Sequence, residues 1–445
     1  MTRTGATRDQ NGTTRPVGRA VALGIDVGTS GVRAVAVDAD GAMVGSAVQP
    51  LPAPGRDGAR IEQAPELWRT ALTAAVRDLG GRCPLGEVAA LAVDGTSGTL
   101  VLISAAGEPL GPGLMYNDAR AGAEGARIAA VAPPVSGAQG ATSALAKLIH
   151  LEAQGLPSDA WRFVHQADWV AGWLSGRHGL SDENNALKMG YDPVARGWPG
   201  WLDDLGVDRR LLPEVAEPGT PLGRIDPAVA TALGLPDGVT IRAGTTDGVA
   251  SFLATGAARP GEAVTALGST LVVKLVAERP VFDAASGVYS HRLGSLWLPG
   301  GASNSGGQVL AHFFNAAELG RLSARIDPAR PSGLSYYPLV APGERFPIAD
   351  PQLAPRLEPR PADDVLFLQG LFEGIAAIEQ LAYQRLAGLG APSLVSVRSV
   401  GGGAADAVFT RIRAIRLGVP MPAAIDGQAA YGTALLALRG VPQPS

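Results

Sequence analysis

The segment that most constrains the fold of this chain is residues 23–38, which read LGIDVGTSGVRAVAVD. An apolar run over 21–25 leads into Asp26, and a second apolar run over 32–37 follows a Gly-rich turn. β-Branched residues at this density on both sides of a turn predict a β-hairpin. The glycines of the turn allow backbone N–H groups to approach an anion closely.

A carboxylate beside such a turn repels a phosphate group unless a divalent cation lies between them. We therefore expect a nucleotide-phosphate site in which Asp26 holds Mg²⁺. The residues expected to cradle the phosphates are Gly28, Thr29 and Ser30. The alternative is an ordinary hairpin turn, because short Gly-rich motifs often recur by chance.

A partial copy of this pattern occupies residues 262–276, which read EAVTALGSTLVVKLV. It again predicts a strand, a turn and a strand, and the turn residues expected to contact phosphate are Gly268, Ser269 and Thr270. Two such hairpins, each early in one half of the chain, indicate a duplicated domain that binds a nucleotide.

Together with these hairpins, the motif Gly244-Thr-Thr-Asp247-Gly and the Gly401-Gly402-Gly403 loop resemble the FGGY family of carbohydrate kinases. The resemblance covers about residues 19–438. It implies an α/β fold with two ribonuclease-H-like domains, of the actin/hexokinase type, and an interdomain catalytic cleft. It also implies an N-terminal domain over 19–243 that binds the sugar and carries the first phosphate loop, and a C-terminal domain over 244–438 that binds the nucleotide and carries the catalytic base. Residues 1–18 are polar and have no apolar stretch, which favours a disordered tail over a short transit peptide.

Within this resemblance, Asp247 corresponds to the catalytic base, at the end of a strand expected over 239–243. The alternative for Asp247 is the N-cap of the helix that follows it. The Gly-Gly-Gly loop follows a strand expected over 395–400 and corresponds to the family's adenosine-binding loop. Asp406 stands there in place of the family's Asn, so it can accept from the adenine amino group but cannot donate. Phe409 is expected to flank the purine.

The sugar is expected to lie against polar residues that follow a buried strand over 88–93. Thr96 and Ser97 occupy that position, where a ligand meets the carboxyl end of a strand. Asp26 and Asp247 are also expected to contact the sugar. Lys188 is one of only three lysines in the chain. It either contacts the sugar or its phosphate, or it is a surface lysine.

A second sugar-binding segment resembles the family's pattern in the type of each residue. Its members are Asn117, Asp118 and Arg120. The alternative is that Asp118 and Arg120 cap a helix that begins at Ala119.

Composition argues against several other classes of protein. The 445-residue chain has a net charge of −4 and a pI of about 5.8, which is unlike the basic footprint of nucleic-acid-binding proteins. Cys83 is the only cysteine, so no intrachain disulfide can form, and a reducing, cytoplasmic compartment is expected. No apolar run in the sequence suggests a membrane span. We expect a monomer or homodimer that binds neither nucleic acid nor membrane.

The expected activity is ATP- and Mg²⁺-dependent phosphorylation of the terminal hydroxyl of a pentulose. D-Ribulose is expected first and D-xylulose second, because the short second half and the segment 94–99, DGTSGT, resemble a family branch of cyanobacteria and plants. One alternative is a catalytically weak, nucleotide-binding sugar sensor of the same fold. Others are a kinase for a polyol such as glycerol or erythritol, and a different ATPase of the superfamily.

Overall fold

The structure is a computed structural model that describes residues 6–8, 14–16 and 19–441. The tail expected over 1–18 lies largely outside the described residues. Within it, only β1 (Ala6–Arg8) and β2 (Thr14–Pro16) are described, and they pair antiparallel.

The chain packs into two compact units. The first contains Met1–Ala254 and Gln428–Ser445, and the second contains Thr255–Gly427. This division differs from the boundary expected between residues 243 and 244. The difference arises because α8 (Asp247–Ala254) packs against α13 (Ala429–Leu438), so that both helices belong to the first unit. A Cβ at Gly432 would lie 1.8 Å from the Ala250 carbonyl oxygen, so glycine permits this close contact.

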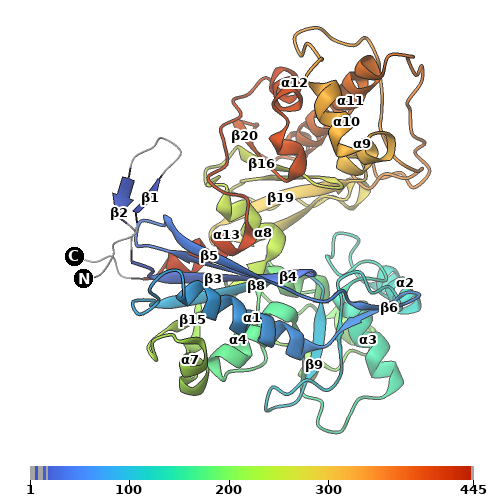
Figure 1. Cartoon of the computed structure of the whole chain (residues 1–445). Helices are drawn as coiled ribbons and strands as arrows, with labels where there is room; N and C mark the ends of the chain where they lie inside the picture. Colours follow the sequence, from blue (N-terminus) through green and yellow to red (C-terminus); the bar gives the residue numbers. More distant parts are fainter. Residues whose placement is uncertain (1–5, 9–13, 17–18, 442–445) are drawn as a thin grey trace. The chain divides into compact units, whose positions relative to one another are not determined.

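The main sheet of the first unit has six strands in the order β14-β15-β8-β3-β4-β5 (Figure 1). Their bounds are β3 (Ala22–Val27), β4 (Gly31–Val37), β5 (Met43–Pro50), β8 (Ala90–Gly95), β14 (Pro221–Arg224) and β15 (Thr240–Thr246). The predicted first hairpin is confirmed, since β3 and β4 pair antiparallel with Asp26 opposite Arg33. β3, β8 and β15 run parallel to one another.

Helices cover both faces of this sheet, which explains why its central strands are almost continuously apolar (Figure 1). α1 (Pro65–Gly80), α4 (Gln166–Ser175) and α7 (Pro227–Leu233) lie on one side, and α8 and α13 lie on the other. A Cβ at Gly24 would lie 2.0 Å from the Ala430 carbonyl oxygen, so α13 can lie on β3 only where the strand has glycine.

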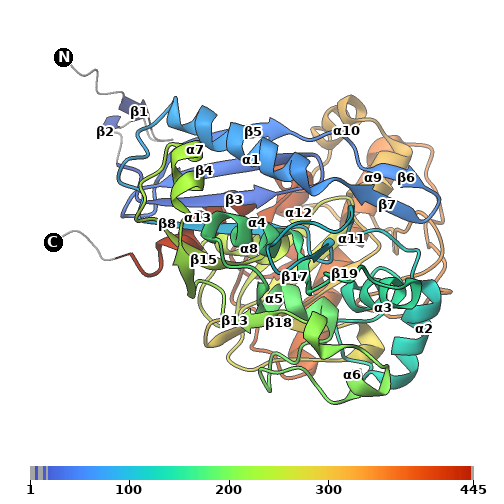
Figure 2. The same cartoon turned by 90° about the horizontal axis from the view of Figure 1, so that it is seen from below.

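The remainder of the first unit is built around a second hydrophobic cluster. It includes a five-stranded sheet in the order β11-β9-β10-β7-β6. Helices α2, α3 and α6 lie in the same region of Figure 2. The bounds are β6 (Gly55–Asp57), β7 (Arg60–Gln63), β9 (Leu100–Ile103), β10 (Gly113–Leu114), β11 (Arg162–His165), α2 (Gly122–Val131), α3 (Ala144–Gln154) and α6 (Trp201–Asp204). The connecting elements are β12 (Leu180–Asp182), α5 (Glu183–Ala186), η1 (Leu187–Met189), η2 (Arg209–Leu211) and β13 (Glu214–Ala216).

The second unit has a five-stranded sheet in the order β18-β19-β17-β16-β20, packed on one core cluster. The strands are β16 (Glu262–Leu267), β17 (Leu271–Leu275), β18 (Tyr289–Leu293), β19 (Leu296–Ser303) and β20 (Ser396–Val400). The helices are η3 (Ala284–Ser286), α9 (Gly307–Phe313), α10 (Ala316–Ser323), α11 (Asp364–Gly388), η4 (Gly402–Ala405) and α12 (Ala407–Leu417). The predicted second hairpin is therefore also confirmed.

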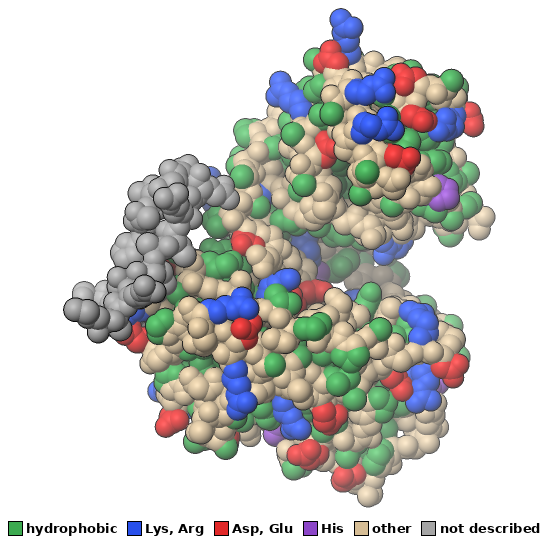
Figure 3. Space-filling view, viewed as in Figure 1, with side chains coloured by type: hydrophobic (Ala, Val, Ile, Leu, Met, Phe, Trp, Pro, Cys, Tyr) green, Lys and Arg blue, Asp and Glu red, His purple; other side chains and the backbone are tan. Residues whose placement is uncertain are grey.

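Among the described residues, α11 alone has the length and apolar composition to cross a membrane. Its most apolar window is 72% buried inside the structure, as in the core helix of a globular domain. On the face shown in Figure 3, basic and acidic side chains of the described residues are interspersed rather than gathered by sign.

Candidate active site

Three carboxyl groups gather at one edge of the main sheet of the first unit. Asp26 and Asp94 lie opposite each other near the carboxyl ends of β3 and β8, and Asp247 follows β15 directly. The parallel register makes these ends coincide, because Thr245 of β15 also lies opposite Asp94. The carboxyl edge of a parallel sheet is where such folds commonly bind ligands.

Burial and mutual repulsion raise the pKa values of two of these acids. Burial raises the pKa of Asp26 to about 6, and the charge of Asp247 adds to the effect. Burial, followed by the charge of Asp26, raises the pKa of Asp94 well above its usual value. Asp94 is fully buried and lies directly opposite Asp26 on the neighbouring strand. Both pKa values are shifted upward, so the two carboxyl groups bind protons more readily than isolated carboxyl groups do.

The role of Asp94 and that of its partner Thr433 were missed by sequence reasoning. The Thr433 hydroxyl, on α13, donates to Asp94 Oδ2. A clue was present in the sequence, because a carboxyl group inside an otherwise apolar strand requires a buried partner. The identity of that partner could not be found, because it lies 339 residues further along the chain.

Asp247 occupies the first position of α8 and is partly exposed. Its Oδ1 accepts a hydrogen bond from the neighbouring Gly248 N–H at 2.6 Å. The Val249 N–H in the first turn donates instead to the Thr246 hydroxyl, at 3.4 Å. The N-cap position of α8 is therefore Thr246, and Asp247 is the first residue of the helix.

The turn over residues 96–99 is held rigidly beside these acids. The Thr96 hydroxyl and N–H both donate to Gln166 Oε1, at 3.1 and 3.2 Å. Gly98 is fixed from another side, because Lys147 Nζ donates to its carbonyl oxygen at 2.8 Å. Ser97, in contrast, is partly exposed and its hydroxyl forms no hydrogen bond with the described residues. Thr96 and Ser97 were both predicted to contact the sugar. The Thr96 hydroxyl already donates to Gln166, whereas the Ser97 hydroxyl can still form a hydrogen bond with a ligand.

The predicted sugar segment 117–120 divides into a buried and an exposed part. Asp118 is fully buried and accepts from the Ile61 N–H at 2.7 Å and from Arg120 Nε at 2.9 Å. Arg120 also donates to Glu62 Oε1 at 2.7 Å. These bonds tie the segment to β7, so Asp118 is occupied by protein groups and does not present its carboxylate to a sugar. Neither residue caps a helix at Ala119, since α2 begins at Gly122. Asn117 remains partly exposed.

In the second unit, the two predicted Gly-rich loops meet at one edge of the sheet. β16 and β20 are parallel neighbours, so the loop that begins at Gly268 lies beside the loop that begins at Gly401. A Cβ at Gly401 would lie 2.7 Å from the Leu267 carbonyl oxygen, and the φ of Gly401 is +86°, which favours glycine. Gly268 and Ser269 are exposed. This arrangement suits the close approach of a phosphate or a nucleoside to the backbone.

Two residues predicted to contact adenosine have structural roles here. Asp406 is the N-cap of α12, and its Oδ1 accepts from the Phe409 N–H at 2.8 Å. Phe409 is 2% exposed and stacks on Phe372, with ring centroids 4.5 Å apart. Phe409 therefore belongs to the core of the second unit and offers no free face to a purine. Gly402 and Gly403 lie in η4, between these residues and β20.

A buried ion pair contacts the two strands that lead into the Gly-rich loops of the second unit. Arg413 of α12 donates two hydrogen bonds of 2.6 Å to Glu379 of α11, and both side chains are fully buried. Thr265 of β16 also donates to Glu379, and Arg413 donates to Ser399 of β20 at 2.7 Å. The pair thus connects two helices to the two strands that lead into the loops.

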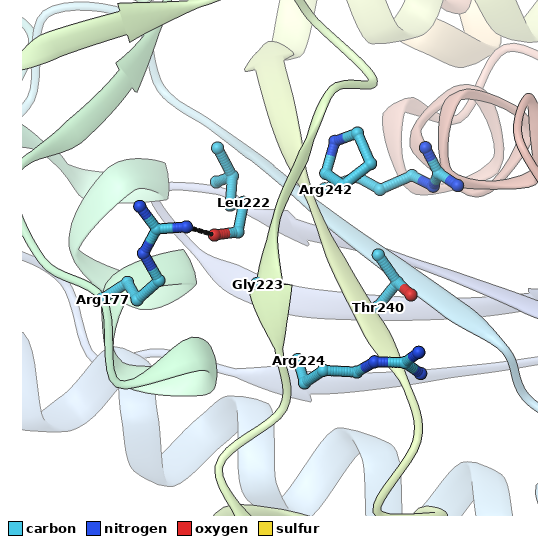
Figure 4. A pocket seen from close by; sticks show the side chains of 7 residues that line it. Arg177, Leu222, Gly223, Arg224, Thr240 and Arg242 are labelled. Carbon is cyan, nitrogen blue, oxygen red and sulfur yellow. Dashed lines mark hydrogen bonds between the residues drawn. The ribbon is translucent and has the colours of Figure 1, made fainter.

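A pocket with a volume of about 360 Å³ lies at the β14 edge of the first unit (Figure 4). Three arginines line it, and each donates to a backbone carbonyl: Arg177 to Leu222, Arg224 to Gly238 and Arg242 to Gly219. In Figure 4 the Arg224 and Arg242 side chains extend to one side of the strands, and Arg177 lies on the other side. The pocket lies at the start of β15, at the opposite end of the strand from Asp247.

The described residues include no group of three or more His, Cys, Asp or Glu side chains that could hold a metal ion by themselves. Mg²⁺ does not require such a cage, because it usually keeps several waters and binds one or two carboxylates together with substrate phosphates. The carboxylate of Asp26, beside the Gly-rich turn that follows β3, matches that donor set.

Comparison with known proteins identifies both units. The model of the FGGY family of carbohydrate kinases, N-terminal domain, matches residues 21–254, and the C-terminal domain model matches residues 263–441. The xylulose kinase of Streptomyces rubiginosus is 29% identical over 343 residues, which cover 73% of this chain and 68% of that protein. The erythritol kinase of Brucella abortus (strain 2308) is 27% identical over 379 residues, covering 74% and 70% of the two chains.

Among solved structures, a xyloylose kinase from Brucella ovis is similar with a TM-score of 0.85 and 24% identity. The similarity covers 95% of this chain and 91% of that one. It confirms the expected fold class, a mixed α/β fold with two sheet-containing domains of the actin/hexokinase type. The chain therefore belongs to the FGGY family of carbohydrate kinases, which are phosphotransferases that act on sugars.

Proposed function

We propose that this chain is an ATP-dependent kinase that phosphorylates the terminal hydroxyl of a pentulose, with D-ribulose preferred and D-xylulose second. The observation that carries the proposal is the gathering of Asp26, Asp94 and Asp247 at the carboxyl edge of one sheet. A partly exposed carboxylate at such an edge can remove a proton from a bound hydroxyl.

Each group at this edge has a distinct part in the proposed reaction. Asp247 accepts the proton of the attacking hydroxyl. Asp26 holds Mg²⁺ together with the phosphates of ATP, and the cation would neutralise charge on the phosphoryl group. Asp94 has a positioning role, because it lies directly opposite Asp26 on the neighbouring strand and is itself held by Thr433.

The phosphates and the nucleoside are assigned to backbone groups of the Gly-rich turns. In the first unit these are Gly28, Thr29 and Ser30, where the Gly28 N–H closes the turn on the Gly31 carbonyl at 3.0 Å. In the second unit they are the turns at 268–270 and 401–403. Backbone N–H groups that are fixed before the reaction stabilise developing charge without needing to reorganise.

The choice of a neutral pentulose follows from the side chains at the sheet edge. Asp26 and Asp247 accept hydrogen bonds from hydroxyl groups and repel an anionic acceptor. Ser97 adds a small hydroxyl that is not engaged by protein. Several similar proteins are xylulose kinases, which favours a five-carbon ketose. The similar erythritol kinase makes a short polyol the second candidate.

The test is a panel of D-ribulose, D-xylulose, L-ribulose, L-xylulose, glycerol, erythritol and gluconate, with ADP release as the readout and Mg²⁺-ATP as the donor. We expect the highest kcat/KM with D-ribulose. Ser97→Ala should raise the KM for D-ribulose more than that for ATP. A higher kcat/KM with glycerol, erythritol or gluconate than with either D-pentulose would overturn the pentulose assignment. Nucleotide and sugar binding without turnover would favour a sensor.

A further inference from the structure

Two of the three lysines of this chain lie at the turn over residues 96–99. They differ in whether the ammonium group donates hydrogen bonds to the protein. Lys147 of α3 is fully buried, and its Nζ donates to the carbonyl oxygens of Gly98 and Met115, at 2.8 and 2.7 Å. Lys188 of η1 is partly buried, and its side chain lies beside Gly98. A Cβ at Gly98 would lie 3.3 Å from Lys188 Cδ and 3.9 Å from Lys188 Nζ.

The Lys188 ammonium forms no hydrogen bond or ion pair with the described residues. Its position is nevertheless fixed by the elements around it. η1 continues directly from α5, where Asn184 Nδ2 donates to the Thr245 hydroxyl of β15 at 3.0 Å. Both of these side chains are buried. Since β15 leads into Asp247, the helical turn that carries Lys188 is anchored to the strand that positions the proposed base.

The electrostatic surroundings of Lys188 agree with this position. Burial lowers the pKa of the Lys188 ammonium, and the charge of Asp247 opposes that effect. Lys188 in turn lowers the pKa of Lys147, which places the two ammonium groups near each other. The Lys188 amine nitrogen therefore lies near both the 96–99 turn and Asp247, the two features that the proposed function assigns to the acceptor sugar, and its N–H groups can donate hydrogen bonds there.

We propose that Lys188 donates a hydrogen bond to the carbonyl oxygen of a ketose acceptor, and so selects ketoses over the corresponding polyols. This inference rests on the proposed function and deepens it. The carboxylates at the site only accept hydrogen bonds, so they suit the hydroxyl groups of a sugar. A carbonyl oxygen also only accepts, so it needs a donor, and an ammonium group offers three donors and no acceptor.

A kinetic experiment compares each ketose with a polyol that differs only at the carbonyl carbon: D-ribulose with ribitol, and D-xylulose with xylitol. The variants are Lys188→Met, which keeps the length without the charge, and Lys188→Arg, which keeps a charged donor. Lys274→Met is the matched control, because Lys274 lies in β17 of the second unit. Circular dichroism and thermal unfolding show whether each variant is folded.

Lys188→Met should raise the KM for the ketose about ten- to a hundredfold, as expected for loss of a hydrogen bond from a charged donor. The KM for ATP and the kinetics with the polyol should change by less than about threefold, because neither depends on the carbonyl group. Lys188→Arg should recover part of the ketose preference. An unchanged ratio of ketose to polyol kcat/KM in Lys188→Met would overturn the proposal.

A labelling experiment tests the same contact without turnover. Acetic anhydride modifies free amines, and peptide mass spectrometry separates the three lysines, with Lys147 as a buried internal reference. D-Ribulose or D-xylulose should slow acetylation of Lys188, and ribitol should protect much less. Protection by a ketose supports the contact even if no sugar is phosphorylated, a result that would refute only the proposed activity. If neither ketose protects Lys188, the contact is refuted even in an active kinase.

Discussion

Asp247 is the residue on which the proposed chemistry depends most directly. Asp247→Asn keeps the shape of the side chain and its acceptor for the Gly248 N–H, but it removes the base. Turnover with the best acceptor should fall by about 10²–10⁴, as is typical for loss of a positioned general base. Steady-state ADP release measures the fall, and calorimetry should show that binding of ATP and sugar is largely retained. A variant with more than a tenth of wild-type turnover contradicts the assignment.

Asp26 is the proposed Mg²⁺ ligand, so its loss should affect the cation. Asp26→Ala should raise the Mg²⁺ concentration required for half-maximal activity by about tenfold or more. Titration of activity with Mg²⁺ at fixed ATP measures the change. Circular dichroism is the control for folding, because Asp26 lies in the central strand β3. An unchanged titration at the wild-type rate would show that another group holds the cation.

Lys147 gives the first unit a pH-dependent stability whose sign can be worked out. Burial lowers its pKa to about 7, while Asp118 opposes the shift. Between about pH 7 and 10 the unfolded chain binds one more proton at this residue than the folded chain does. The free energy of unfolding should therefore rise with pH in that interval, by up to about 1.4 kcal/mol per pH unit.

The matching experiment compares the wild type with Lys147→Met by denaturant unfolding between about pH 7 and 9. Tryptophan fluorescence reports mainly the first unit, because Trp297 alone of the seven tryptophans lies in the second. The difference in unfolding free energy between the two proteins should grow with pH. Parallel curves for the two proteins would show that the buried ammonium keeps an ordinary pKa.

At the scale of a helix, Asp406 shows most clearly how an observed role can differ from the predicted one. The sequence predicts that Asp406 contacts adenine, and in the structure it caps a helix. As the N-cap of α12, it satisfies a first-turn N–H group. Asp406→Ala should lower the stability of the second unit by about 1 kcal/mol, whereas Asp406→Asn should change it little, because asparagine caps equally well. Chemical denaturation monitored by far-UV circular dichroism checks this. Equal stability of all three proteins would show that the cap contributes nothing.

The elements that were predicted from sequence are those whose signals are local. Both hairpins follow from β-branched runs around Gly-rich turns. The burial of Phe409 could not be predicted in this way, because it depends on Phe372 of α11. The burial of Asp118 depends likewise on Arg120 and on the Ile61 N–H of β7. A residue type that matches a family pattern does not reveal which protein groups already occupy the side chain.

At the scale of the whole molecule, the first unit is discontinuous in sequence and the second is continuous. Removal of residues 428–445 takes away α13, which covers one face of the main sheet and carries Thr433. We expect this truncation to unfold the first unit and to leave the second unit folded. Limited proteolysis with mass spectrometry should yield a resistant fragment near Thr255–Gly427. Retention of native tryptophan fluorescence by the truncated protein would contradict this prediction.

The late position of α13 also sets an order for folding during synthesis. When the ribosome has translated the first 254 residues, the strands and most helices of the first unit exist, but the face of β3 at Gly24 still lacks its cover. The segment Thr255–Gly427 then emerges as an uninterrupted stretch and can fold as it leaves the exit tunnel. The nascent chain must therefore keep an apolar sheet surface from aggregating until α13 has been synthesised, which makes it a natural client for chaperones.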